Sequence, residues 1–143
     1  MFLLDTNVVS LGSPLTGVES SDARAWLRRV ADRSFLSVIT IAELQYGASR
    51  LLATGSSRKG TALAAWLGGI LNDFSNRILP VEIATARRAG ELYARAMAGG
   101  DDPGFQDSCI AATADLHRFA VVTYNARHFA AFGVPFIAPG DSE

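Results

Sequence analysis

Short apolar runs that alternate with helix-like segments constrain the fold of this 143-residue chain more than any other feature. Sheet-favouring or wholly apolar runs predict strands over residues 1–4, 34–39, 77–81, 119–123 and 135–137. Helical patterns predict one turn over 8–11 and helices over 22–32, 40–53, 59–74, 83–97, 105–118 and 125–132. Strands that alternate with helices predict a three-layer α/β/α fold, with a mainly parallel sheet covered by helices on both faces.

The chain contains enough apolar material for one hydrophobic core, because 49% of its residues are hydrophobic. Loop-like composition marks Gly12–Ser21 and Gly99–Gly104. The sequence shows neither an internal repeat nor a low-complexity tract or linker. We therefore expect a single domain over residues 1–143.

Polar side chains occupy the junctions at which the expected strands pass into helices. Asp5 follows the first strand, and Glu43 lies one turn into the helix after the second. Asp107 opens a later helix, and Asn125 lies just beyond the fourth strand. Ligands bind outside the carboxyl ends of the strands in open parallel sheets. Four distant segments therefore each bring an acid, or its amide analogue, to a region where they can converge.

Helix capping is the alternative reading of each of these residues. Asp5, Asp107 and Asn125 all fit the N-cap position. The segment from Thr40 to Glu43 fits a capping box, in which Glu43 bonds back to the Thr40 amide. Taken together, however, acids from separate segments that meet in space repel one another. A hard divalent cation among them relieves that repulsion and prefers carboxylate oxygen as its ligand.

Charge and cysteine content narrow the range of partners and compartments. Thirteen basic and fourteen acidic residues give a net charge of −1, which excludes a globally basic nucleic-acid binder. The single cysteine, Cys109, allows no intrachain disulfide and is expected to be a buried small hydrophobe. Residues 61–71 form the longest uncharged, mostly apolar stretch, well short of the about 20 residues that span a bilayer. With no signal peptide evident, we expect a cytoplasmic protein without a membrane partner.

Four segments, in this order along the chain, together carry the motifs of one protein family. They are FLLDTNVVS with Asp5, SVITIAELQYG with Glu43, QDSCIAATA with Asp107, and VVTYNARHF with Asn125. Together with the final GVPFI they resemble the PIN-domain ribonucleases, and within them the VapC- and FitB-like toxins of bacterial type II toxin–antitoxin pairs. The resemblance covers essentially the whole chain. It implies a PIN-like α/β/α fold and a Mg²⁺- or Mn²⁺-dependent endoribonuclease.

The resemblance also implies the roles of the acidic residues. Asp5, Glu43 and Asp107 would hold the metal that generates the hydroxide attacking an RNA phosphodiester. The family often carries a fourth acid where this chain has Asn125, and an amide oxygen brings no charge. Asn125 is therefore a possible ligand only, and the number of metal ions, one or two, stays open.

Other polar residues near these segments have two readings each. Thr6, Asn7 and Thr123 are expected to orient the metal ligands, with turn and cap chemistry as the alternative. For His128 an exposed or capping position is favoured over contact with substrate. Asp101 and Asp102 are expected to be solvated loop acids.

The implied partners are an RNA substrate, a second copy of the chain, and a small antitoxin that binds operator DNA. Such antitoxins commonly insert a basic side chain into the acidic pocket of the toxin. Tyr46, Leu52 and Trp66 on the two long helices are candidate interface residues. Core packing is nevertheless expected of each of them singly, so the homodimer rests on the family alone.

Three rival functions remain open at this point. A PIN fold that binds RNA without cleaving it would follow if Asn125 abolished metal activity. A receiver-type signalling module also uses Mg²⁺ and strand-end carboxylates, but it usually needs a lysine after a late strand, and the only lysine, Lys59, lies mid-chain. A DNA or flap nuclease of the PIN type is usually larger and richer in acids. A metal titration discriminates the first rival from an enzyme.

Overall fold

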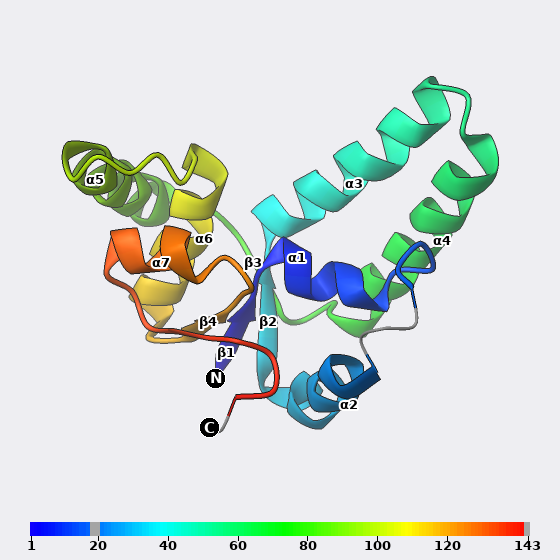
Figure 1. Ribbon diagram of the computed structural model, residues 1–143, viewed down its shortest axis with the longest axis horizontal. Coiled ribbons are helices and arrows are strands. Elements are labelled where there is room, and N and C mark those ends of the chain that lie inside the picture. Colours follow the sequence, from blue (N-terminus) through cyan, green and yellow to red (C-terminus); the bar gives the residue numbers. More distant parts are fainter. Residues whose placement is uncertain (18–20, 142–143) are drawn as a thin grey trace.

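A parallel sheet forms the centre of the computed structural model, which describes residues 1–17 and 21–141 (Figure 1). The strands in these residues are β1 (Phe2–Leu4), β2 (Ser34–Ser37), β3 (Ile78–Leu79), β4 (Ala120–Val122) and β5 (Phe136–Ile137). They are arranged in the order β3-β2-β1-β4-β5, and each neighbouring pair is parallel. The expected parallel sheet is confirmed.

Helices cover both faces of the sheet, which confirms the expected three-layer architecture (Figure 1). The helices are α1 (Thr6–Val9), α2 (Ser21–Val30), α3 (Val38–Ala53), α4 (Ser57–Asp73), α5 (Ile83–Ala98), α6 (Phe105–His117) and α7 (Ala126–Phe132). The last three lie on one side of the sheet, and α1, α2 and α4 lie on the other (Figure 1). Helices α3 and α4 form an antiparallel hairpin that projects from the body of the molecule (Figure 1).

Two hydrophobic cores, one on each face, explain why β1 is apolar without interruption. Successive side chains of a strand point to opposite faces. Leu3 accordingly packs into the core that contains Ile110 of α6, whereas Phe2 and Leu4 pack into the core that contains Leu67 of α4. All three strand residues are less than 10% exposed. A strand buried on both faces has no position for a polar side chain before its end.

The start of α3 differs from the expectation. The strand ends at Ser37, which has extended backbone and whose hydroxyl accepts a hydrogen bond from the Ile39 amide at 3.1 Å. Val38 therefore begins the helix, although it and Ile39 are β-branched and had been read as strand. Thr40 lies inside the helix and is buried, so the expected helix start and the capping box with Glu43 are wrong.

The remaining boundaries lie close to the expected ones. The expected turn over residues 8–11 is split between α1 and a 3₁₀ turn over Ser10–Gly12. In the expected loop Gly12–Ser21, residues 18–20 lie outside the described residues, and α2 begins at Ser21. Helix α6 ends one residue early because Arg118 adopts a left-handed φ of 57°. Among the described helices, none is both long enough and apolar enough to cross a membrane.

The exposed surface of the α3–α4 hairpin includes two of the three candidate interface residues. Tyr46 is 68% and Leu52 is 45% exposed, so the expectation of core packing is wrong for both. Trp66 is partly buried and packs against the core beneath α4, as expected. The hairpin therefore presents apolar side chains to solvent.

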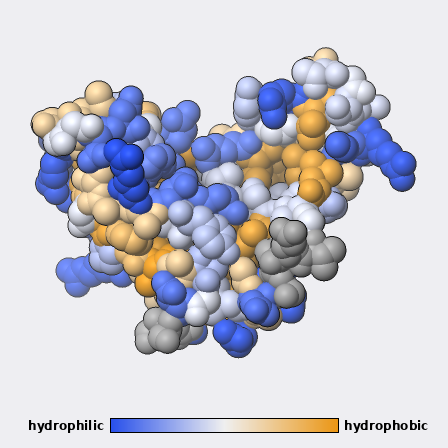
Figure 2. Space-filling model, in the orientation of Figure 1, coloured by the Kyte–Doolittle hydropathy of each residue, from blue (hydrophilic) through white to orange (hydrophobic). Residues whose placement is uncertain are grey.

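The order of the strands fixes where a ligand site can lie. The chain runs outward in both directions from β1, so the crevice between the carboxyl ends of β1 and β4 is the switch point of the sheet. On this side of the molecule the surface dips between the α3–α4 hairpin and the helices α5 and α6, and hydrophilic colour marks the floor of the dip (Figure 2). The polar residues at the strand ends line this region.

Candidate active site

Asp5 occupies the centre of the switch point, directly after β1. Its side chain is almost fully buried, with 3% of the residue exposed. One carboxylate oxygen accepts the Thr6 amide at 2.7 Å, and the other accepts the Thr123 hydroxyl at 2.7 Å. Asp5 does cap α1, as the alternative reading held, but only one of its two oxygens is used in this way. The other oxygen ties the end of β1 to the residue after β4.

Glu43 reaches the same region from the second turn of α3. It is partly buried and accepts a hydrogen bond from the Thr6 hydroxyl. The same hydroxyl lies 3.4 Å from the hydroxyl of Thr40. Thr6 therefore contacts Asp5 through its amide and Glu43 through its side chain, and it holds two of the expected ligands in one neighbourhood.

Asp107 approaches from the opposite side, on the first turn of α6. It is the third residue of that helix, and its Oδ2 lies 2.7 Å from Nδ1 of His128 on α7. The N-cap of α6 is Gly104, which has a φ of 91° that side chains rarely tolerate. The capping reading of Asp107 is therefore wrong, since a glycine without a side chain stands at the cap.

The pKa values of Asp5 and Glu43 are both raised, and the charge of Asp107 contributes to each shift. The pKa of Asp5 is raised from 3.8 to about 6. Burial is the largest cause, the charges of Asp107 and Glu43 add to it, and the hydrogen bonds from Thr123 and Thr6 oppose it. The pKa of Glu43 is raised as well, chiefly by burial and then by Asp107, while its hydrogen bond from Thr6 lowers it. Asp5 and Glu43 therefore lie in a poorly solvated region in which the charge of Asp107 raises the pKa of both.

Asn125 stands at the edge of this cluster. Its backbone amide donates to the Thr123 hydroxyl at 2.8 Å, and the same hydroxyl donates to Asp5. Asn125 occupies the N-cap position of α7, as the capping alternative expected, but its side chain makes no capping hydrogen bond. Asn7 accepts the Tyr124 amide at 3.3 Å through its side-chain oxygen. Thr6, Asn7 and Thr123, which are expected to orient the metal ligands, thus each contact a segment that carries one of those ligands.

The donor set suits a hard divalent cation, since it consists of carboxylate oxygens in a region that disfavours their charge. Within residues 1–17 and 21–141, no three carboxylate, imidazole or thiol groups stand together in the arrangement of a metal site. Each acid is instead turned toward a protein partner: Asp5 toward Thr123, Glu43 toward Thr6, and Asp107 toward His128. Binding one ion through all three acids therefore requires side-chain rotation.

Sequence reasoning missed the contact made by His128. It was expected to be exposed or capping, yet it contacts Asp107 and its side chain is 41% exposed. The signal in the sequence was its place, three residues beyond Asn125 and thus on the first turn of the helix that follows β4. The position of His128 in the sequence could not show that α6 brings Asp107 next to it.

Three other acids and the cysteine lie outside the cluster. Asp101 and Asp102 lie in the loop before α6, as expected, partly exposed and exposed respectively. Asp101 also pairs with Arg127, and Asp102 accepts a hydrogen bond from the Tyr93 hydroxyl at 2.9 Å. Asp115 pairs with Arg88 two turns further along α6. Cys109 is buried, as expected, and burial raises the pKa of its thiol.

The fold and this edge of the sheet define a PIN domain. The family model described as the PIN domain matches residues 2–134, and the chain belongs to that family. The VapC ribonuclease Y4jK of Sinorhizobium fredii is 35% identical over 142 residues, which cover 97% of each chain. Toxin FitB of Neisseria gonorrhoeae is 34% identical over 140 residues, which cover 97% of this chain and 98% of FitB.

Solved structures agree with these relatives. A structure of FitAB bound to a DNA fragment aligns with a TM-score of 0.84 and 33% identity, covering 100% of this chain and 98% of that one. A crystal structure of FitAcB from Neisseria gonorrhoeae aligns with a TM-score of 0.83 and 34% identity, covering 97% of this chain and 98% of that one. The expected resemblance to the VapC- and FitB-like PIN proteins is confirmed.

Proposed function

We propose that this chain is a Mg²⁺- or Mn²⁺-dependent endoribonuclease and the toxin of a type II toxin–antitoxin pair. Two observations carry the proposal: Asp5 lies at the switch point of a PIN fold, and the charge of Asp107 raises the pKa of both Asp5 and Glu43. The ribonuclease and toxin names of relatives that match the chain over almost its whole length support it.

The chain's own residues would prepare the site for a cation and a phosphodiester. When bound, a divalent ion lowers the pKa of water and stabilises negative charge on phosphate oxygens. Asp5, Glu43 and Asp107 would hold the ion, and its charge would offset the burial and repulsion that raise the pKa of Asp5. Thr6 and Thr123 hold the carboxylates of Glu43 and Asp5 through their hydroxyls, which restricts the directions in which those ligands point.

The proposed partners follow from what the related structures contain. The relative FitB is named a toxin, and the related structures contain FitAB bound to a DNA fragment and FitAcB. We propose that a small antitoxin with affinity for operator DNA inhibits this chain, and that the chain forms a homodimer. Expression of the chain alone should arrest bacterial growth, and co-expression of the reading frame beside its gene should restore growth.

Cleavage assays on the purified protein test the catalytic part of the proposal. We expect a labelled RNA to be cut in Mg²⁺ or Mn²⁺ and to remain intact in EDTA. Asp107→Asn should reduce cleavage about 100-fold, because loss of a charged ligand weakens metal binding. Asp115→Asn is the matched control, since Asp115 lies on the same helix but pairs with Arg88. Full cleavage by Asp107→Asn, or equal losses in both variants, would contradict the metal role of Asp107.

Calorimetry separates the enzyme from a PIN domain that only binds RNA. Titration of Mn²⁺ should show binding to the wild-type protein, weakened in Asp107→Asn and unchanged in Asp115→Asn. RNA binding without cleavage and without metal binding would favour the binding module. Asn125→Asp should tighten metal binding if position 125 contacts the ion, because it replaces an amide by a charged oxygen.

A further inference from the structure

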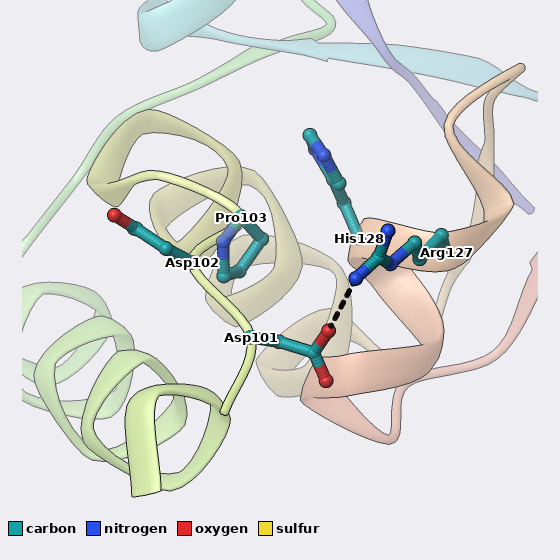
Figure 3. Close-up of a pocket in the computed structure, with 5 residues that line it drawn as sticks. All are labelled: Asp101, Asp102, Pro103, Arg127 and His128. Atoms are coloured by element: carbon teal, nitrogen blue, oxygen red, sulfur yellow. Dashed lines mark hydrogen bonds and ion pairs between the residues drawn. The ribbon is translucent and has the colours of Figure 1, made fainter. Parts of the chain in front are cut away.

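A small polar pocket of about 170 Å³ opens beside the candidate active site (Figure 3). It lies between the loop that precedes α6 and the first turn of α7, and it is lined by Asp101, Asp102, Pro103, Arg127 and His128. His128 also contacts Asp107, with 2.7 Å between Nδ1 and Oδ2. The wall of this pocket and the carboxylate cluster therefore share one residue.

An ion pair spans the pocket. Nη2 of Arg127 lies 3.4 Å from Oδ1 of Asp101, and the side chains are 86% and 37% exposed (Figure 3). An ion pair that is open to water contributes little to stability, because solvent screens it and two flexible side chains must be ordered. The guanidinium group is therefore available to a stronger anion. Its planar fork of donors matches phosphate oxygens, which it can bind through two parallel hydrogen bonds.

The other side of the active site has a different character. A larger hollow of about 480 Å³ lies there. It is lined by Glu43 together with Ile39, Ala42, Tyr46 and Gln106. Apolar and aromatic surface of this kind suits the flat faces of nucleobases. The polar pocket with its exposed arginine suits the anionic backbone. A single RNA strand crossing the site would thus place bases in the hollow beside Glu43 and a backbone phosphate in the pocket beside Asp107.

We propose that Arg127 binds a phosphate of the RNA strand beside the cleaved bond, and that Asp101 competes with this phosphate for Arg127. The inference rests on the proposed ribonuclease function. In the free protein Asp101 holds Arg127 across the pocket. When RNA binds, Arg127 exchanges the carboxylate for a phosphate. Asp101 therefore weakens RNA binding, and Arg127 strengthens it.

This exchange predicts opposite effects for the two members of one ion pair. Arg127→Gln should weaken RNA binding about 5–10-fold, as expected for the loss of one charge-assisted phosphate contact. Asp101→Asn should strengthen binding about two- to fivefold, because it frees Arg127 from its partner. A purely structural ion pair would give changes of the same sign, since either substitution breaks the same contact.

Two variants control for charge and for position. Asp102→Asn removes the same charge from the same pocket, but Asp102 bonds to Tyr93 and not to Arg127. It should therefore strengthen binding less than Asp101→Asn. Arg88→Gln removes an arginine that pairs with Asp115 at 2.7 Å and does not line the pocket. It should leave RNA binding unchanged.

The experiment measures the fluorescence anisotropy of a 5′-labelled, 12-nucleotide single-stranded RNA against increasing KCl. It is run in EDTA to prevent cleavage, and cleavage of the same RNA is followed separately in Mg²⁺. Arg127→Gln should also reduce the slope of log affinity against log salt by about one. In the Arg127→Gln background, Asp101→Asn should no longer strengthen binding beyond the effect of Asp102→Asn. Thermal melts establish that each variant is folded.

The possible results separate this inference from the function on which it rests. Opposite shifts for Arg127→Gln and Asp101→Asn, with little change in the two controls, support the exchange. Shifts of the same sign, or equal effects of Asp101→Asn and Asp102→Asn, overturn it while leaving the ribonuclease proposal intact. A wild-type protein that neither binds this RNA in EDTA nor cleaves it in Mg²⁺ overturns both.

Discussion

Replacing Asp5 with asparagine should stabilise the metal-free protein at alkaline pH, although it removes an expected catalytic residue. The carboxyl group has a pKa of about 6 in the folded chain, against 3.8 in the absence of the fold, and burial is the largest cause. The folded state therefore binds a proton more tightly than the unfolded state. Stability falls as the pH rises through the interval from 3.8 to about 6, and the loss is complete above it.

The size of the effect follows from this shift and from the hydrogen bonds of Asp5. A shift of about two pKa units corresponds to about 3 kcal/mol at 1.36 kcal/mol per unit. Asparagine has a single side-chain oxygen, so it cannot accept from both the Thr6 amide and the Thr123 hydroxyl. Losing one such hydrogen bond costs about 1 kcal/mol. The net gain at alkaline pH should therefore be about 2 kcal/mol.

Thermal unfolding in EDTA provides the measurement. At about pH 8 the Asp5→Asn variant should melt about 6 °C above the wild type, at about 3 °C per kcal/mol for a chain of this size. At about pH 4 the advantage should vanish or reverse, since the wild-type carboxyl is then protonated. Asp73→Asn, at the exposed end of α4, should change neither value.

Added Mg²⁺ should reverse the order of the two proteins. It should raise the melting temperature of the wild type, because ligands stabilise the state that binds them, and should have little effect on Asp5→Asn. A variant that is less stable than the wild type at both pH values would refute the reasoning. An equal gain at both would also refute it, since the effect would then not depend on ionisation.

Three further predictions concern hydrogen bonding, packing and assembly. Thr123→Val removes a hydrogen bond that lowers the pKa of Asp5, so this pKa should rise further. In urea unfolding the variant should lose about 1–2 kcal/mol of unfolding free energy at about pH 8, and less at about pH 4. Gly60→Ala should cost about 1–3 kcal/mol in urea unfolding, because its Cβ would lie 2.7 Å from Cγ of Leu52 and 3.0 Å from its amide nitrogen. Gly69→Ala, whose added Cβ meets nothing within 4 Å, should stabilise the same helix by up to about 1 kcal/mol. Leu52→Glu places a charge on the exposed apolar surface of the α3–α4 hairpin and should convert a homodimer to monomers in light scattering, whereas an unchanged mass would argue against this face as the interface.

The positions of the expected ligands could be predicted because they depend on a simple rule. In a parallel sheet every strand points the same way, so residues that follow different strands arrive at one edge. This places Asp5 and Thr123 side by side, although they are far apart in the chain. The alternation of element types was sufficient to predict both the sheet and the edge at which its polar residues gather.

The start of α3 and the contact of His128 were harder to predict, for different physical reasons. Val38 and Ile39 favour strands, yet the helix begins at Val38, where the Ser37 hydroxyl caps it by accepting a hydrogen bond from the Ile39 amide. The pairing of His128 with Asp107 depends on how α6 and α7 pack against each other, and local patterns carry no information about that packing. The pKa of Asp5 depends likewise on burial by segments distant in sequence.

The central place of β1 has a consequence for when the site can form during synthesis. The first strand pairs with β4, and the Asp5 amide donates to the carbonyl of Val122 at 3.0 Å. Thr123, which donates to Asp5, is translated 118 residues after it. A ribosome must therefore make the chain as far as β4 before the residues at these strand ends can gather. The order of synthesis itself thus keeps the unfinished chain from having an assembled site.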